Sequence, residues 1–224
     1  MNRLRRPLGR RFVQTLLTVA TLVAIANLLH RVVFPQTPPP PASFPRAGDT
    51  FASATEGFDQ KVVAVRDGWL VLETRVAPRA PGPPLHVHRT FAETFTVASG
   101  SLSIELPGET KVLGAGESFT IPAGTPHRPH NPSDTEVVIG GDAAAMPQVV
   151  GACLVQLYHF LDAAAGEVGP ATGLRIAALD PSCDATVAEI PAPVRVGIDW
   201  LVVPFARLFG YRNHYPELAL HQVA

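Results

Sequence analysis

The sequence is poor in cysteine and in lysine. Only Cys153 and Cys183 occur among 224 residues, which excludes a cysteine framework or a cysteine-rich zinc site. Lysine occurs twice against sixteen arginines, and the formal net charge is −1. A balance so close to neutral argues against nucleic acid as a partner. The chain also lacks a phosphate-cradling glycine loop, a dinucleotide fingerprint and a Ser/His/Asp set.

The N-terminal segment has the pattern of a membrane helix. Phe12 to Leu29 is a mainly apolar run, near the minimum length for a span. Five arginines precede it and Arg31 comes after it, which predicts a cytoplasmic N-terminus at the bacterial inner membrane and export of the remainder of the chain. Ala24-Ile25-Ala26 also resembles a signal-peptidase site, so secretion after cleavage is the alternative. Apolar residues continue beyond that site to Phe34, which favours an uncleaved, single-pass anchor.

The chain divides by composition into four segments. Residues 1–34 are an arginine-rich tip and transmembrane anchor, and the proline-rich residues 35–50 are a semi-rigid spacer. Residues 51–143 contain short alternating strands separated by Gly, Pro or Asp-Gly breaks, which predicts an antiparallel β domain. Residues 144–224 form a helical extension, with helices expected at 147–164 and at 192–209, the second kinked at Pro204. The second helix is expected either to lie on the membrane surface or to pack on the first.

Four of the eight histidines lie between Gly82 and Asn131. His86 and His88 are two apart, so a strand places both on one face. Glu93 has the opposite parity, and a turn or bulge within residues 89–92 would return it to that face at the start of the next strand. His127 comes after a Pro-Ala-Gly-Thr turn, early on a returning strand, where it can complete a set of three imidazoles and one carboxylate. His130 has the wrong parity and is left out of the set.

These residues carry a resemblance to the cupin superfamily. His86-x-His88, four residues, Glu93, six residues, Gly100 matches its first motif, although Gly82 stands three residues before His86 where the family has five. The second motif is matched at every position, by Gly116, Pro122, Gly124, His127 and Asn131. The resemblance implies a mainly β fold, a single antiparallel jelly-roll β-barrel carrying the N-terminal transmembrane helix and C-terminal helices. It also implies that His86, His88, Glu93 and His127 bind a divalent transition metal, and that a homodimer is possible.

The sequence does not choose the ion or the reaction. Imidazole and carboxylate ligands suit Mn, Fe, Co, Ni, Cu or Zn. One hypothesis is a membrane-anchored metalloenzyme of the dioxygenase, isomerase or lyase type acting on a small molecule. The other is a non-catalytic module, such as a sensor, that binds a metal or a small ligand. No acid or base beside the metal is evident from the sequence. Cys153 and Cys183 either pair, as export permits, or leave Cys153 as a buried thiol.

Overall fold

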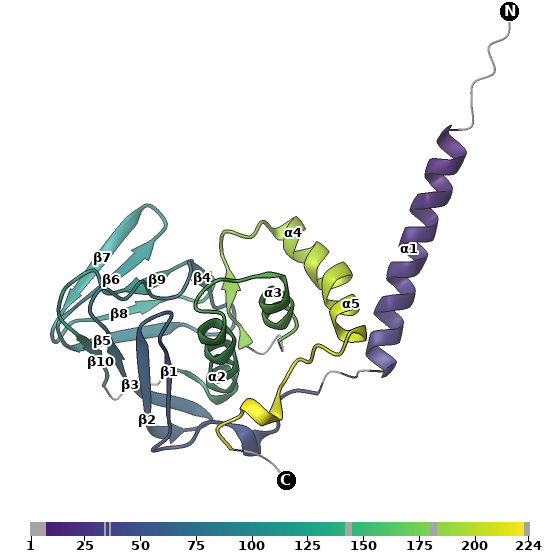
Figure 1. Cartoon of the computed structure of the whole chain (residues 1–224). Coiled ribbons are helices and arrows are strands. Elements are labelled where there is room, and N and C mark those ends of the chain that lie inside the picture. The colour runs from purple at the N-terminus through teal and green to yellow at the C-terminus, as the bar shows by residue number, and fades with distance from the viewer. Residues whose placement is uncertain (1–7, 34, 36, 142–144, 180–182, 222–224) are drawn as a thin grey trace, which may run out of the picture.

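The structure is a computed structural model, and it describes residues 8–33, 35, 37–141, 145–179 and 183–221. Strands occupy the middle of the chain, and helices lie before and after them (Figure 1). Arg3, Arg5 and Arg6 of the predicted tip, and the predicted boundary at residue 143, lie outside the described residues. The fold is a mixture of helices and antiparallel sheets: the expected sheets, N-terminal helix and C-terminal helices are present, and the helical share is larger than a mainly β chain has.

The strands form three antiparallel sheets. The strands of the largest are β1 (Thr50–Ser53), β2 (Phe58–Arg66), β3 (Trp69–Val76), β10 (Val137–Ile139), β5 (Glu93–Ser99) and β8 (Ser118–Ile121), in that spatial order, with β11 (Met146–Pro147) also on β3. The second sheet has the order β7 (Glu109–Gly114), β6 (Ser101–Leu106) and β9 (Arg128–His130), and the third pairs β12 (Thr186–Val187) with β4 (His86–Val87). Among the described strands no ladder joins these sheets into a closed barrel. Closure therefore remains a prediction.

The first hydrophobic core lies between the two larger sheets. Val97 on β5 and Val76 on β3 are fully buried, and so are Leu102 and Ile104 on β6. On β5 the buried residues Phe95 and Val97 alternate with more exposed ones, whereas on β6 Ser103, between Leu102 and Ile104, is buried as well. The alternation read from the sequence predicted these inward faces correctly.

A second core joins the sheet to helix α2 (Gln148–Ala163). Leu70 and Val62 pack there with Val150 and Tyr158 of α2. The carboxylate of Asp162, near the end of α2, accepts hydrogen bonds from Ser53 Oγ and from the amides of residues 54 and 55 at 2.9–3.1 Å. The helix predicted at 147–164 is thus confirmed, and it is held against β1 and the turn after it.

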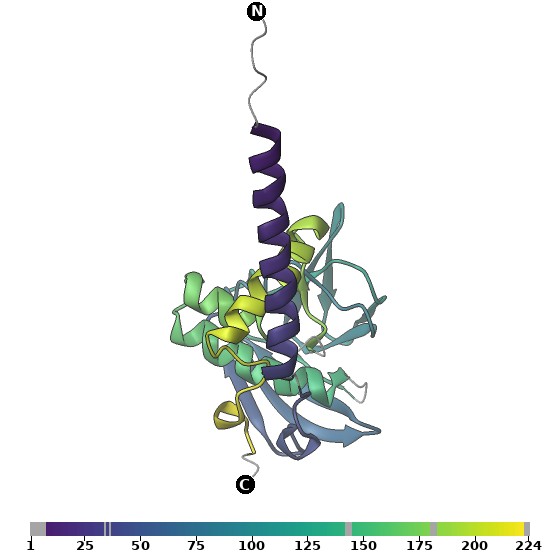
Figure 2. The same ribbon diagram turned by 90° about the vertical axis from the view of Figure 1, so that its right-hand side faces the viewer.

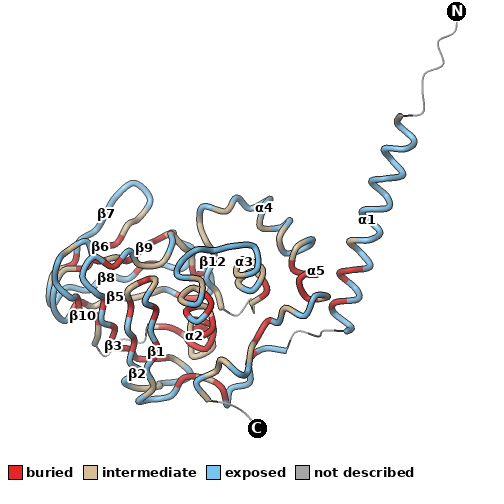
Figure 3. Tube along the Cα trace, viewed as in Figure 1, coloured by how far each residue is buried: buried red, intermediate tan, exposed pale blue. Residues whose placement is uncertain are grey.

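Helix α1 (Leu8–Val33) projects away from the rest of the molecule (Figures 1 and 2). An 18-residue stretch of it has a mean hydropathy of 2.0, and residues 9–33 are long and apolar enough to cross a membrane. Most of α1 is exposed, while Ala26, Asn27 and His30 are buried (Figure 3). An apolar helix that ends in a packed segment fits either an anchor or a signal sequence.

The buried part of α1 contacts the last helical segment. That segment consists of α4 (Ala192–Gly197), a π-helical turn at Ile198–Val202 and α5 (Val203–Leu208). Pro204 has no N–H, so the carbonyl of Trp200 lacks its usual donor four residues on. The side-chain amide of Asn27 donates to that carbonyl at 2.7 Å. The helix predicted at 192–209 is therefore present as a continuous helical segment with a π-helical turn just before Pro204, and a polar contact with α1 satisfies the Trp200 carbonyl.

The last segment packs chiefly on α1 and on α3 (Pro170–Ala177) rather than on α2. Trp200 and Phe209 remain exposed, at 58% and 81%. The alternative prediction that this segment packs against α2 was thus wrong: its partners are α1 and α3. Contact of this segment with a membrane surface stays a prediction. Two short 3-10 helices, η1 (Pro41–Ser43) and η4 (Pro216–Leu218), complete the described elements.

Candidate metal centre

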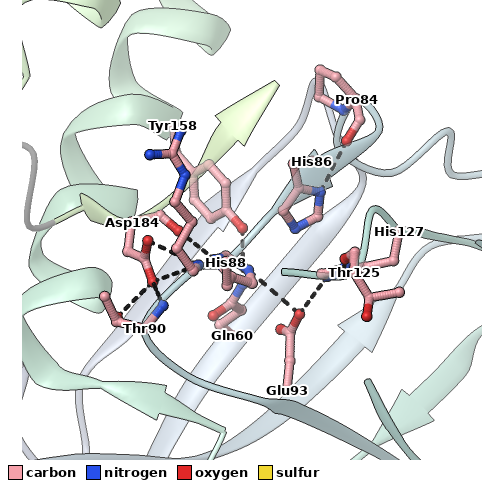
Figure 4. A network of polar contacts seen from close by, with 11 residues as sticks. Gln60, Pro84, His86, His88, Thr90, Glu93, Thr125, His127, Tyr158 and Asp184 are labelled. Atoms are coloured by element: carbon pink, nitrogen blue, oxygen red, sulfur yellow. Dashed lines mark hydrogen bonds and ion pairs between the residues drawn. The ribbon is translucent and has the colours of Figure 1, made fainter. Parts of the chain in front are cut away.

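The four side chains singled out in the sequence converge. One ligand atom from each of His86, His88, Glu93 and His127 lies within 4.8 Å of the others (Figure 4). Glu93 Oε2 is 2.9 Å from His127 Nε2 and 3.5 Å from His88 Nε2. Such a group is consistent with a metal site, and nothing in the geometry identifies the ion. Among the described residues, His130, His159, His214 and His221 are not part of it.

Local backbone structure brings the four together. His86 lies on β4 and is bridged to His127, each amide donating to the other's carbonyl at 2.9–3.0 Å. The chain bends at Arg89 and Thr90, and β5 then begins at Glu93. The turn predicted within residues 89–92 is therefore confirmed. Antiparallel pairing of β5 with β8 then places Glu93 opposite Ile121, just before the turn that leads to His127.

Each imidazole is oriented by a backbone carbonyl. His86 Nδ1 lies 2.9 Å from the carbonyl of Pro84, and His127 Nδ1 lies 2.9 Å from that of Thr125. A carbonyl only accepts, so we assign the proton of each ring to Nδ1. In the neutral ring Nε2 then keeps its lone pair, which is the form that binds a metal.

His88 is fixed in the same way, but by a distant residue. Its Nδ1 lies 2.6 Å from the carbonyl of Asp184, in the C-terminal extension. The Nε2 atoms of His88 and His127 both face the Glu93 carboxylate, and lone pairs so placed repel it. A positive charge, either a proton or a metal ion, is needed among these atoms.

The pKa values of Glu93 and His88 are shifted in the directions that place a proton or another positive charge between them. Burial alone would raise the pKa of Glu93, but hydrogen bonds with His127 and His88 outweigh it and lower the pKa below its ordinary range. Burial works against protonation of His88, yet the hydrogen bond with Glu93 and its negative charge raise the pKa of that ring. At His86 burial dominates and lowers the pKa to about 4. The carboxylate is thus ionised at neutral pH and His86 is neutral, as metal ligands must be.

The surroundings are apolar on one side and polar on the other. Phe91 stacks on His88 with ring centroids 4.4 Å apart, and Phe95 is 6.5 Å from the His127 ring. Phe95, Val97 and Ile121 are buried in the first core, and Phe119 is partly buried at its margin.

The polar side was not evident from the sequence. Gln60 on β2 donates from Nε2 to the hydroxyl of Tyr158 on α2 at 2.8 Å, beside the cluster (Figure 4). Burial, followed by the charges of Glu56 and Glu93, raises the pKa of Tyr158 well above its ordinary value, so this phenol stays protonated. A small cavity of about 60 Å³ is lined in part by Gln60, Thr74 and Glu93. It has room for a few water molecules or a small polar group.

The motif asparagine supports the site from behind. Asn131 is fully buried, and its side-chain amide donates to the carbonyls of Ala77 and Thr135 at 2.9 and 2.8 Å. It thereby links the segment before β4 to the segment after β9. Asn131 is a structural residue of the second motif and is not a ligand.

Comparison with known proteins agrees with this geometry. Residues 72–139 match the family model Cupin_2, described as a cupin domain. The chain carries a cupin domain. Quercetin 2,3-dioxygenase of Bacillus subtilis is 36% identical to it over 72 residues, which are 30% of this chain and 21% of that enzyme. The chain thus spans about a fifth of the length of the curated relative that it matches.

The solved structures similar to this chain include two cupin proteins, each covering less than half of it. A cupin-2 domain protein of Shewanella frigidimarina shares 26% identity, with 36% of this chain and 76% of that chain covered and a TM-score of 0.32. A sugar phosphate isomerase of Silicibacter pomeroyi shares 20% identity, with 42% and 66% covered and a TM-score of 0.36.

Proposed function

We propose that this protein is a membrane-anchored, exported metalloenzyme whose cupin domain binds one divalent transition metal through His86, His88, Glu93 and His127. The observation that carries the proposal is the common orientation of the three imidazoles. Each Nδ1 is held by a carbonyl, which leaves three Nε2 lone pairs and one carboxylate around a single point. A metal there would supply a Lewis acid or, if redox-active, a site for dioxygen chemistry.

The chain's own residues provide the rest of the proposed chemistry. Gln60 and the protonated Tyr158 lie on the polar side of the cluster, where they can position a substrate oxygen or donate a proton to it. Phe91 and Phe95 keep the other side apolar. Because the matched relative is a quercetin dioxygenase, dioxygenation is the first reaction to assay, with flavonols as trial substrates and oxygen uptake as the readout. Isomerase and lyase reactions on small molecules are the next classes.

A non-catalytic metal-binding module is the second candidate. The cavity of about 60 Å³ favours it, because ligand pockets commonly enclose roughly 300–1,000 Å³. A metal-loaded protein that consumes no oxygen and turns over no trial substrate would favour this module.

Metal content tests both candidates. The full chain, purified in detergent, stripped with a chelator and then offered Mn, Fe, Co, Ni, Cu and Zn in turn, is expected to retain about one equivalent of at least one ion, because the four ligands can enclose a single ion. Mass-spectrometric elemental analysis after desalting measures it. Retention of less than about a tenth of an equivalent of every ion would overturn the proposal.

We also propose that α1 remains attached as an anchor, with the cupin domain outside the cytoplasm. The Cys153–Cys183 disulfide, at a Cα–Cα distance of 5.3 Å, supports an exported location. The possible cleavage site at Ala24–Ala26 lies in a continuous helix, and Ala26 and Asn27 are buried against the last helical segment. In the folded chain this packing covers the peptide bond that the peptidase would cut.

Membrane-fraction protein is accordingly expected to keep the whole of α1. Intact-mass measurement should give the uncleaved chain, and a protease added to spheroplasts should digest the cupin domain. A mature protein that begins at Asn27 would favour the secreted form instead.

A further inference from the structure

A short segment of the C-terminal extension lies along the metal-ligand strand. We call residues 183–190 the strap. Its strand β12 pairs with β4, Val187 opposite His86 and Thr186 opposite Val87. Ala188 adds a hydrogen bond from its amide to the carbonyl of Leu85 at 2.8 Å. Among the described strands, β12 of the strap is therefore the only one that pairs with β4.

Asp184 in the strap contacts the site through two groups, its backbone carbonyl and its carboxylate. Its carbonyl accepts the hydrogen bond from His88 Nδ1 at 2.6 Å. Its carboxylate accepts from the amides of Arg89 and Thr90 at 3.0 and 2.8 Å, and from Thr90 Oγ1 at 2.6 Å (Figure 4). These hydrogen bonds lower the pKa of Asp184, although burial acts in the opposite direction. One residue thus fixes both the His88 ring and the bend that leads to Glu93.

The strap is itself anchored. Cys183, next to Asp184, forms a disulfide with Cys153 in α2. Helix α2 is held to the sheet by its apolar face and by the hydrogen bonds of Asp162. A covalent bond therefore connects a rigid part of the fold to the residue that orients His88.

The rings of His86 and His127 are oriented by nearby residues and do not depend on the strap. The carbonyls that hold His86 and His127 belong to Pro84 and Thr125, each two residues before its ring. The carbonyl that holds His88 comes from 96 residues further along the chain. If the strap moved away, His88 would lose its Nδ1 partner, its ring could rotate, and the proton could reside on Nε2, where it blocks metal binding.

We propose that Asp184 is a positioning residue of the metal centre, held in place by the Cys153–Cys183 disulfide, so that metal affinity depends on the strap. The proposal rests on the proposed function, since it presumes that the cluster binds a metal. It adds to the four ligands a part of the chain that lies outside residues 72–139, the matched cupin domain.

Cobalt titration of the metal-free full chain in detergent tests the proposal. Chelator competition gives the dissociation constant, and the visible absorption of bound Co²⁺ reports the geometry of its ligands. Asp184→Ala keeps the backbone carbonyl but removes the carboxylate that holds the strap on residues 89 and 90. It is expected to weaken Co²⁺ binding by about 10–100-fold at unchanged stoichiometry, the range found when the support of a ligand is lost. The Cys153→Ser/Cys183→Ser pair is expected to weaken it in the same direction and to shift the cobalt spectrum in the same way.

Two variants separate positioning from general damage. Asp184→Asn keeps an acceptor oxygen for the Arg89 and Thr90 amides and is expected to restore binding to within about threefold of the parent. Asp134→Ala removes a carboxylate whose side chain is 79% exposed and which pairs with Arg79; it is expected to bind as the parent does. If the parent binds one equivalent, and Asp184→Ala and the cysteine pair match its affinity and spectrum, the inference is wrong and the proposed function stands. If the parent itself binds no ion, the proposed function fails and this inference with it.

Discussion

Glu93→Gln is expected to bind divalent transition metals at least about 100-fold more weakly than the parent, because a ligand contributes more than the residues that orient it. Glutamine keeps the shape of the side chain but removes the negative charge that faces His127 and His88. The Glu93 side chain is only 12% exposed, so solvent screens that charge weakly. Metal titration with chelator competition measures the change.

The matched control is Glu117→Gln. This glutamate is exposed, and its carboxylate accepts a hydrogen bond from the amide of Gly114, away from the cluster. Its metal affinity should equal that of the parent. Parent-like binding by Glu93→Gln would show that the ion, if bound, uses a different set of ligands.

Gly82→Ala is expected to lower the free energy of unfolding by about 3 kcal/mol, from overpacking together with a strained backbone. Gly82 has φ +69°, and a Cβ there would lie 1.9 Å from the carbonyl oxygen of Pro129 on β9. The obstacle is backbone, which cannot swing aside as a side chain can. We expect the melting temperature of the full chain to fall by roughly 6–12 °C, followed by circular dichroism.

Gly108→Ala separates the two causes. Gly108 has φ +83° but open space around its Cα, so alanine there meets backbone strain without a clash. Its expected loss is about 1 kcal/mol. Equal melting temperatures for the two variants would contradict the argument that close approach to β9 requires glycine at position 82.

The parts of the site that sequence could predict are local. His86 and His88 share a face by strand parity, a bend returns Glu93, and a proline-glycine turn brings His127 back. The relations among His86, His88 and Glu93 span a few residues, so spacing restricts their geometry. The same holds for the inward faces of the strands, since alternation is a property of each strand by itself. The approach of His127 to Glu93 spans 34 residues, and the match to the second motif indicated it rather than spacing.

The features that sequence could not predict depend on contacts between distant segments. Asp184 reaches His88 across 96 residues, and Tyr158 reaches Gln60 across 98. No periodicity or motif marks such a pair. The sequence does not decide whether the two cysteines pair, for the same reason. They are 30 residues apart, and that separation does not determine the distance between their Cα atoms. The packing of the last helical segment on α1 involves Asn27, whose polar side chain in an apolar helix gives no indication of its partner.

The position of the strap in the chain sets an order of assembly. During synthesis from the N-terminus, all four ligands have emerged once residue 127 is made, whereas Asp184 and Cys183 emerge more than fifty residues later. An early metal ion would meet a His88 ring with no carbonyl to hold it, and would be free to leave. If the cluster binds a metal and the protein is exported, as proposed, the centre is complete only once the chain is nearly finished and Cys183 is joined to Cys153. On those two proposals, tight metal retention is expected only after the protein has left the cytoplasm.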